Sequence, residues 1–173
     1  LRAGVTSMFD VDGIFNIGPA LRDSINAGVV EGPTMKSGSY ALMTAVGGTA
    51  GKLIPDSGTA GYAEVVRNKE ETVLAVRRQV KDGADCIKIH VTGSIPTRSG
   101  EIQVWTREEL KVVCDTAHDL GVRVTAHCRG DKATLDSVMA GVDIIWHASF
   151  LGDASLEAII DKKVPVGPVF TFL

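Results

Sequence analysis

"GADCIKIHVTG", residues 83–93, is the stretch that decides the fold. It reads as a buried β-strand, but it carries a lysine and a histidine two positions apart. Alternation along a strand places Lys88 and His90 on one face. Ile87 and Ile89 then lie on the other face. A lysine in a strand covered on both faces is costly unless another group neutralises it or uses it.

Three further stretches share the same pattern of a glycine, a β-rich run and a polar residue. They read "AGVTSMFD", "LGVRVTAH" and "AGVDIIWH", and the polar residue six positions after the glycine is Asp10, His127 or His147. Glycine commonly follows the last turn of a helix, and the run behind it is typical of a strand. Each pattern therefore predicts a helix end followed by a strand.

Helix start signals fill the gaps between these strands. Thr106 and Glu109 form a capping box that opens a helix running to Leu120. Asn68 and Glu71 make a similar box for a helix that ends at Gly83. Two further helices are expected to be capped by aspartates, at Asp131 and Asp153.

The alternation of strand and helix predicts a parallel sheet with helical crossovers, in an α/β fold. An open doubly wound sheet and a closed (β/α)8 barrel both fit this order. The GxGxxG turn that would favour the open sheet is absent from the sequence. The long stretch 32–68 is expected to hold one strand near Pro33–Ser37 and then an active-site loop.

The composition limits the kinds of molecule that the protein is expected to bind. The chain has 173 residues, 45% of them hydrophobic, and a formal net charge of −3, which fits one sizeable core. The slight acidity and the lack of a basic run argue against nucleic acid, and no apolar stretch is long enough to span a membrane. Three cysteines, an odd count, favour a reducing compartment and thus a cytoplasmic location. The composition is compatible with a homo-oligomer as well as with a monomer.

The polar residues fall at the carboxyl ends of the predicted strands, the edge that carries the site in parallel α/β folds. Lys88, His127 and His147, from three successive strands, should converge there. Three more residues are candidates for contacting the substrate or holding another ligand in place: His90, Asp10 and Arg129. For Arg129 a surface salt bridge is the favoured expectation, with a substrate carboxylate as the alternative partner. For Asp10 the favoured role is a cap of the following turn.

Three chemical roles are open to Lys88. Its amine could form an imine as a nucleophile, since burial lowers the pKa of a lysine. It could be a plain ion-pair partner. It could also react with CO₂ to give a carbamate, an anionic ligand with two oxygens. The neighbouring histidines favour the carbamate, because imidazoles are good Zn²⁺ ligands and contribute little to an imine mechanism.

In the order "LRAGVTSMFDVDG", "GADCIKIHVTGSI", "GVRVTAHCRG" and "GVDIIWHASF", the sequence resembles the amidohydrolase superfamily. The similarity is greatest to the branch of imidazolonepropionase-related proteins and Xaa-Pro or Xaa-Arg dipeptidases. It implies a (β/α)8 TIM barrel with one or two divalent metal ions, expected to be zinc. Lys88 matches the N6-carboxylated lysine of that family, and His127 and His147 match its metal-binding histidines.

Two parts of the family pattern do not appear. The His-x-His of strand one would precede Leu1, and the catalytic aspartate of strand eight would follow Leu173. Residues 1–173 are therefore expected to be a partial barrel, about strands 2 to 7. Strand 1, strand 8 and any β-sandwich domain would lie elsewhere.

The resemblance implies hydrolysis of an amide bond, in a dipeptide or a non-peptide small molecule, by a metal-activated hydroxide. This activity is expected of the full-length parent, and the fragment itself is expected to be inactive. Two alternatives remain. One is a non-catalytic binding or scaffold protein with a barrel core, and the other is an aldolase-like enzyme that forms an imine on Lys88.

Overall fold

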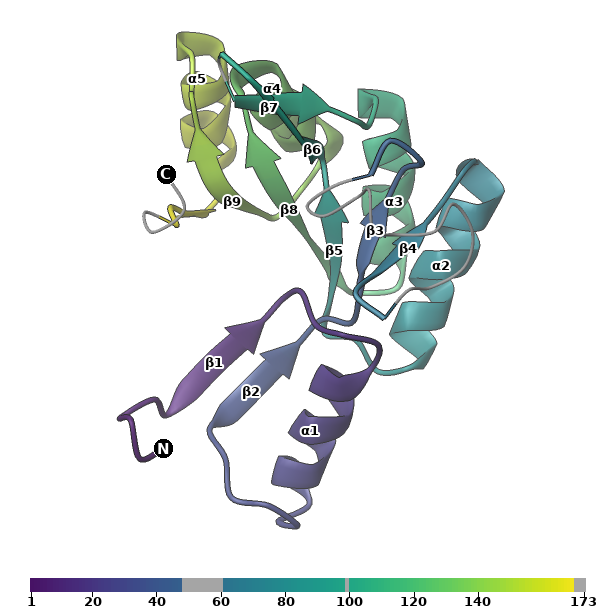
Figure 1. Ribbon diagram of the computed structural model, residues 1–173, viewed down its shortest axis with the longest axis vertical. Helices are drawn as coiled ribbons and strands as arrows, with labels where there is room; N and C mark the ends of the chain where they lie inside the picture. The colour runs from purple at the N-terminus through teal and green to yellow at the C-terminus, as the bar shows by residue number, and fades with distance from the viewer. Residues whose placement is uncertain (48–60, 99, 170–173) are drawn as a thin grey trace.

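The computed structural model describes residues 1–47, 61–98 and 100–169, and it shows an α/β fold (Figure 1). Six parallel strand positions follow one another in chain order, with the second interrupted after Ser37. The strands are β1 (Ser7–Asp10), β2 (Thr34–Ser37) with β3 (Ala41–Met43), β5 (Cys86–His90), β8 (Arg123–Arg129), β9 (Ile144–Ser149) and β10 (Val166–Gly167). This order confirms the prediction of part of a (β/α)8 barrel. In an open doubly wound sheet the strand order would instead reverse direction partway across the sheet.

The strands are divided between two sheets because the chain kinks between β2 and β3. β1 pairs with β2 in a two-stranded sheet, whereas β3 joins the larger sheet, of order β10-β9-β8-β5-β3-β4. Gly38 lies at the kink, where an added Cβ would meet the carbonyl oxygen of Val11 at 2.8 Å. β4 (Ala63–Val65) is an edge strand beside β3 that the sequence did not predict. Residues 48–60, where the active-site loop was expected, lie outside the described part of the chain.

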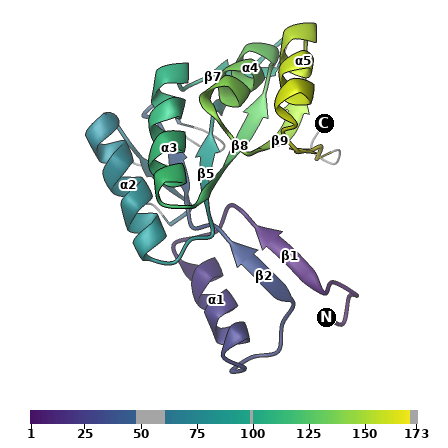
Figure 2. The same ribbon diagram turned by 180° about the vertical axis from the view of Figure 1, so that it is seen from behind.

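Helices connect the strands; α2 to α5 cover one face of the larger sheet, as Figure 2 shows from behind, whereas α1 packs on β2 of the two-stranded sheet. They are α1 (Ile17–Asn26), α2 (Lys69–Lys81), α3 (Arg107–Asp119), α4 (Asp131–Ala140) and α5 (Asp153–Lys162). From α2 to α5, each helix packs on the next one along the chain. This is the arrangement expected of successive βα units in a barrel wall.

The predicted capping box of α3 is confirmed. Thr106 accepts a hydrogen bond from the Glu109 backbone N–H, and the Glu109 carboxylate accepts from the Thr106 N–H. At α2, Asn68 accepts from the Glu71 N–H as predicted. The Glu71 carboxylate, however, bonds the backbone and side chain of Arg67 instead of closing the box.

The predicted aspartate caps of the last two helices are wrong by one position. Gly130 and Gly152 are the N-cap residues, and the aspartates are the first helical residues. The physical reason lies in a contact between the two helices. The Asp131 carboxylate accepts from the Gly152 N–H at 2.8 Å and from the Ser155 hydroxyl, so it caps α5 rather than its own helix.

A β-hairpin that was not expected from the sequence follows β5. β6 (Thr92–Thr97) and β7 (Gly100–Gln103) pair antiparallel with a register shift between Thr92 and Pro96. Figure 1 shows the hairpin beyond the carboxyl ends of the strands of the larger sheet. It therefore covers the edge at which the sequence places the site.

The burial of the side chains of β5 agrees with the alternation predicted from the sequence. Ile87 and Ile89 are fully buried and pack in the core between the sheet and the helices. Lys88 and His90 are only 5% and 2% exposed on the opposite face. Both faces of β5 are covered, so the lysine does lie in a desolvated environment.

Candidate active site

Three histidines form a continuous cluster at the carboxyl ends of β5, β8 and β9. His90 pairs in register with His127, and their rings stack with centroids 5.0 Å apart. The ring of His147 meets His127 edge-on at 4.6 Å. The convergence predicted for the two strand-end histidines is thus present, and His90 joins them.

Lys88 lies one pleat below His90 on the same face. Its Nζ is 5.9 Å from the centroid of the Trp146 ring and 3.8 Å from Oδ2 of Asp12. Burial lowers the pKa of Lys88, although Asp12 acts in the opposite direction. The structure therefore favours an amine that loses its proton more readily than a lysine in water.

Two carboxylates that the sequence analysis missed contact the histidines. Asp12 Oδ2 lies 2.7 Å from His90 Nε2, which is also 3.3 Å from the Tyr62 hydroxyl. Glu101, on β7 of the hairpin, places Oε2 2.7 Å from His127 Nε2. A "DG" pair just past the first strand and the turn-rich "SIPTRSG" after the central strand were the available signals for these segments.

The other predicted residues lie at different distances from this cluster. Asp10 accepts a hydrogen bond from the Ser37 hydroxyl at 3.3 Å, and Asp12, not Asp10, contacts a histidine. Arg129 Nη1 is 3.9 Å from Glu101 Oε1, so Arg129 does reach the edge of the cluster. Its Nε is buried and has no hydrogen-bond partner among the residues that the structure describes.

Burial favours the neutral form of two of the imidazoles, those of His147 and His90. Burial lowers the pKa of His147 to about 4, helped by His127 and the nearby cations. Burial also lowers the pKa of His90, although Asp12 opposes the shift. For Glu101 burial acts to raise the pKa, but hydrogen bonds from His127 and Thr92 outweigh it and the net shift is downward. Neutral imidazoles and an ionised carboxylate are the forms that bind or orient metal ions.

The carboxyl end of β9 has an unusual backbone. His147, Ala148 and Phe150 all have positive φ, at 74°, 48° and 59°. Non-glycine residues in this region are uncommon and cluster at functional sites. The Nδ1 atom of His147 is buried without a partner in the described part of the molecule. The Nδ1 atom of this ring is thus available for a ligand.

The donor set fits a divalent metal if Lys88 takes part. Within residues 1–47, 61–98 and 100–169, no three His, Cys, Asp or Glu side chains are grouped closely enough to hold a metal ion. His127 and His147 supply two imidazoles, and a carbamate on Lys88 would supply the missing anionic oxygens. The orphaned Nδ1 of His147 is the observation that fits such a ligand role.

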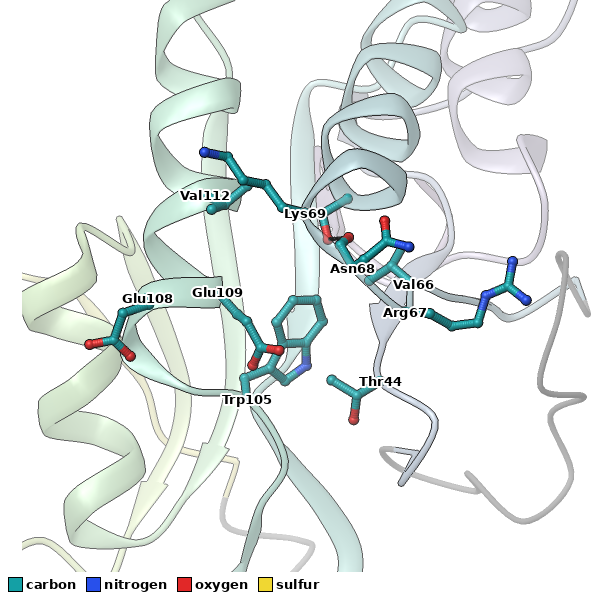
Figure 3. Close-up of a pocket in the computed structure, with 10 residues that line it drawn as sticks. Thr44, Val66, Arg67, Asn68, Lys69, Trp105, Glu108, Glu109 and Val112 are labelled. Atoms are coloured by element: carbon teal, nitrogen blue, oxygen red, sulfur yellow. Dashed lines mark hydrogen bonds between the residues drawn. The ribbon is translucent and has the colours of Figure 1, made fainter.

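A separate pocket of about 220 Å³ lies between the N-terminal ends of α2 and α3 (Figure 3). Its walls include Val66, Val112 and the indole of Trp105. None of the clustered histidines lines it. It is therefore a feature distinct from the candidate active site.

No helix among the described residues is both long and apolar enough to cross a membrane.

Comparison with known proteins identifies the family of the chain. The family model described as "Amidohydrolase family" matches residues 1–166. The ochratoxinase of Aspergillus niger is 28% identical over 181 aligned residues, which cover 95% of this chain and 37% of the relative. Its crystal structure superposes with a TM-score of 0.80 at 26% identity, over 96% of this chain and 42% of that one.

Two solved peptidase-like structures are also similar. A Xaa-Pro dipeptidase with bound methionine in its active site gives a TM-score of 0.85 at 29% identity, over 98% of this chain and 43% of that one. A putative prolidase from Bifidobacterium longum gives 0.74 at 30% identity, over 92% and 36% of the two chains. The chain thus spans about two fifths of the length of these relatives. By the family match and by its strand order, the chain belongs to the amidohydrolase family.

Proposed function

We propose that the protein is a metal-dependent hydrolase that cleaves an amide bond in a dipeptide or an N-acyl amino acid. The observation that carries the proposal is the edge-on contact of His127 and His147 near the carboxyl ends of β8 and β9, beside β5, the adjacent parallel strand that carries Lys88. Because the chain spans about two fifths of its relatives, this activity is proposed for the whole protein that holds it.

The proposed metal ligands are the two imidazoles and a carbamate on Lys88. A neutral lysine amine adds to CO₂, forming an N–C bond and releasing one proton, and it leaves a two-oxygen anion. The lowered pKa of Lys88 supports this step, because only the unprotonated amine reacts. A divalent metal bound there would polarise the substrate carbonyl and lower the pKa of water to about 7.

The remaining polar residues suit the binding of a substrate with a carboxylate. Arg129 carries a buried Nε that has no partner in the described residues, and a guanidinium binds carboxylates well. His90 is oriented by Asp12 at the same edge of the sheet. We infer that Arg129 and His90 contact the substrate. The names of the relatives, a Xaa-Pro dipeptidase and a putative prolidase, support a substrate that ends in an amino acid.

A substrate panel tests the proposal. The protein, expressed from its complete reading frame, is loaded with Zn²⁺, Mn²⁺ or Co²⁺ in bicarbonate buffer. It is then incubated with Xaa-Pro dipeptides, other dipeptides and N-acyl amino acids, and the products are followed by mass spectrometry. We expect metal-dependent cleavage that falls at least ~100-fold in Lys88→Met and His147→Asn. Lys81→Met, at an exposed position at the end of α2, is the matched control and should retain activity.

Two results would overturn the proposal. One is a complete lack of metal-dependent cleavage across the panel. The other is a substrate adduct trapped on Lys88 by borohydride, which would show an imine-forming lysine instead.

A further inference from the structure

We propose that Glu101 is a positioning residue that holds His127 in the tautomer whose Nδ1 binds the metal. This inference rests on the proposed function and adds a residue that comes from the β6–β7 hairpin and not from the sheet. In this proposal the hairpin supplies the carboxylate that orients a metal-binding histidine.

The position of the Glu101 carboxylate is fixed by three groups. Its Oε2 lies 2.7 Å from His127 Nε2 and accepts a hydrogen bond from the Thr92 hydroxyl, also at 2.7 Å. Arg129 Nη1 approaches the other oxygen, Oε1, at 3.9 Å. The Thr92 hydroxyl in turn accepts from the Arg129 backbone N–H at 3.2 Å. The carboxylate is thus held between the start of the hairpin and the end of β8.

This contact selects one tautomer of His127. A glutamate is ionised at neutral pH and can only accept hydrogen bonds. The proton of a neutral His127 ring therefore belongs on Nε2, and the lone pair belongs on Nδ1. A carboxylate on the second nitrogen is the usual means of orienting a metal-binding imidazole, and it also raises the basicity of the ligand atom.

The backbone of the hairpin is shaped for this approach. Gly100, directly before Glu101, has φ +122°, and an added Cβ would lie 2.5 Å from the carbonyl oxygen of Arg129. Only glycine allows β7 to come this close to the end of β8. The close approach brings Glu101 within reach of a histidine 26 positions away in the sequence.

The tautomer can be measured without any metal. Protein labelled with ¹⁵N at histidine is studied by long-range ¹H–¹⁵N correlation spectra, and the signals of His127 are assigned with His127→Asn. We expect a ring protonated on Nε2 in the wild type and a mixture of tautomers in Glu101→Ala. Glu157→Ala, an exposed glutamate on α5, is the matched control and should keep the wild-type pattern.

Metal affinity is the second measurement. In a titration with Co²⁺ followed by its visible absorption, Glu101→Ala should raise the Kd by 10–100-fold, the range typical of such carboxylates. Glu101→Gln keeps the size of the side chain and a carbonyl acceptor, so its loss should be smaller. Circular dichroism of both variants checks that the fold is retained.

The outcomes separate this inference from the proposed function. A wild-type His127 protonated on Nδ1, or Glu101 variants that bind Co²⁺ as tightly as the wild type, would overturn the role of Glu101 while leaving the hydrolase proposal standing. A wild type that does not bind Co²⁺ at all would overturn the proposed function, and with it the role of Glu101 toward a metal.

Discussion

Replacing Gly100 with alanine tests how closely the hairpin must approach the histidine cluster. The new Cβ would lie 2.5 Å from the Arg129 carbonyl oxygen, whereas ordinary contact begins near 3.4 Å, so β7 must move by about 0.9 Å (3.4 − 2.5). If this displacement reaches Glu101, its 2.7 Å contact with His127 lengthens to about 3.6 Å (2.7 + 0.9). A separation of that size is no longer a hydrogen bond.

The substitution also forces alanine into a backbone region that favours glycine. At φ +122° this costs on the order of 1–3 kcal/mol, before any cost of the clash. Gly121→Ala is the matched control, because Gly121 has φ +75° but its added Cβ meets nothing within 4 Å. The control therefore measures a backbone cost without displacement of the hairpin.

The assays are urea unfolding and the histidine spectra described above. We expect Gly100→Ala to lose more free energy of unfolding than Gly121→Ala, and we expect only Gly100→Ala to disturb the His127 signals. Equal losses in the two variants, together with unchanged His127 signals in Gly100→Ala, would refute the reasoning about the hairpin.

Three further predictions concern stability. Asp136→Asn should cost about 1–3 kcal/mol in urea unfolding, because the buried carboxylate accepts from Gln103, Arg107 and Lys132; an unchanged midpoint would contradict this. The wild type should lose stability as the pH falls from about 6.5 to about 4, because unfolded His147 takes up a proton in that window and the folded ring, with its pKa lowered to about 4, does not. His147→Asn should flatten this part of the curve, and an equally steep slope in the variant would count against the assignment. Thr106→Ala should cost about 1 kcal/mol by removing the cap of α3, whereas Thr116→Ala, in the middle of the same helix, should cost less.

Much of the fold could be predicted because its signals are local. The capping box at Thr106 and Glu109 and the glycines that follow the helices are short patterns whose physical effect does not depend on distant parts of the chain. The same holds for strand-end histidines, since parallel strands bring their carboxyl ends to one edge. His127 and His147 meet there for that reason.

The features that were missed depend on contacts between distant segments. Asp131 has the local signature of a cap for α4, but its carboxylate caps α5, 21 positions away. Glu101 belongs to a hairpin with an irregular register, and nothing next to it in the sequence indicates His127 as its partner. Asp12 contacts His90 across 78 positions of sequence. Alternation and helix periodicity carry no information about such pairs.

The measurement that tests the account most directly is the metal content of the whole protein after reconstitution with Zn²⁺ in bicarbonate buffer. The wild type is compared with Lys88→Met, His127→Asn and His147→Asn by mass spectrometry of the bound metal. We predict at least about one ion per wild-type chain, and a loss of most of that metal in each variant, because each removes a proposed ligand. A wild type that retains no metal, or variants that retain as much as the wild type, would contradict the assignment of this cluster as a metal centre.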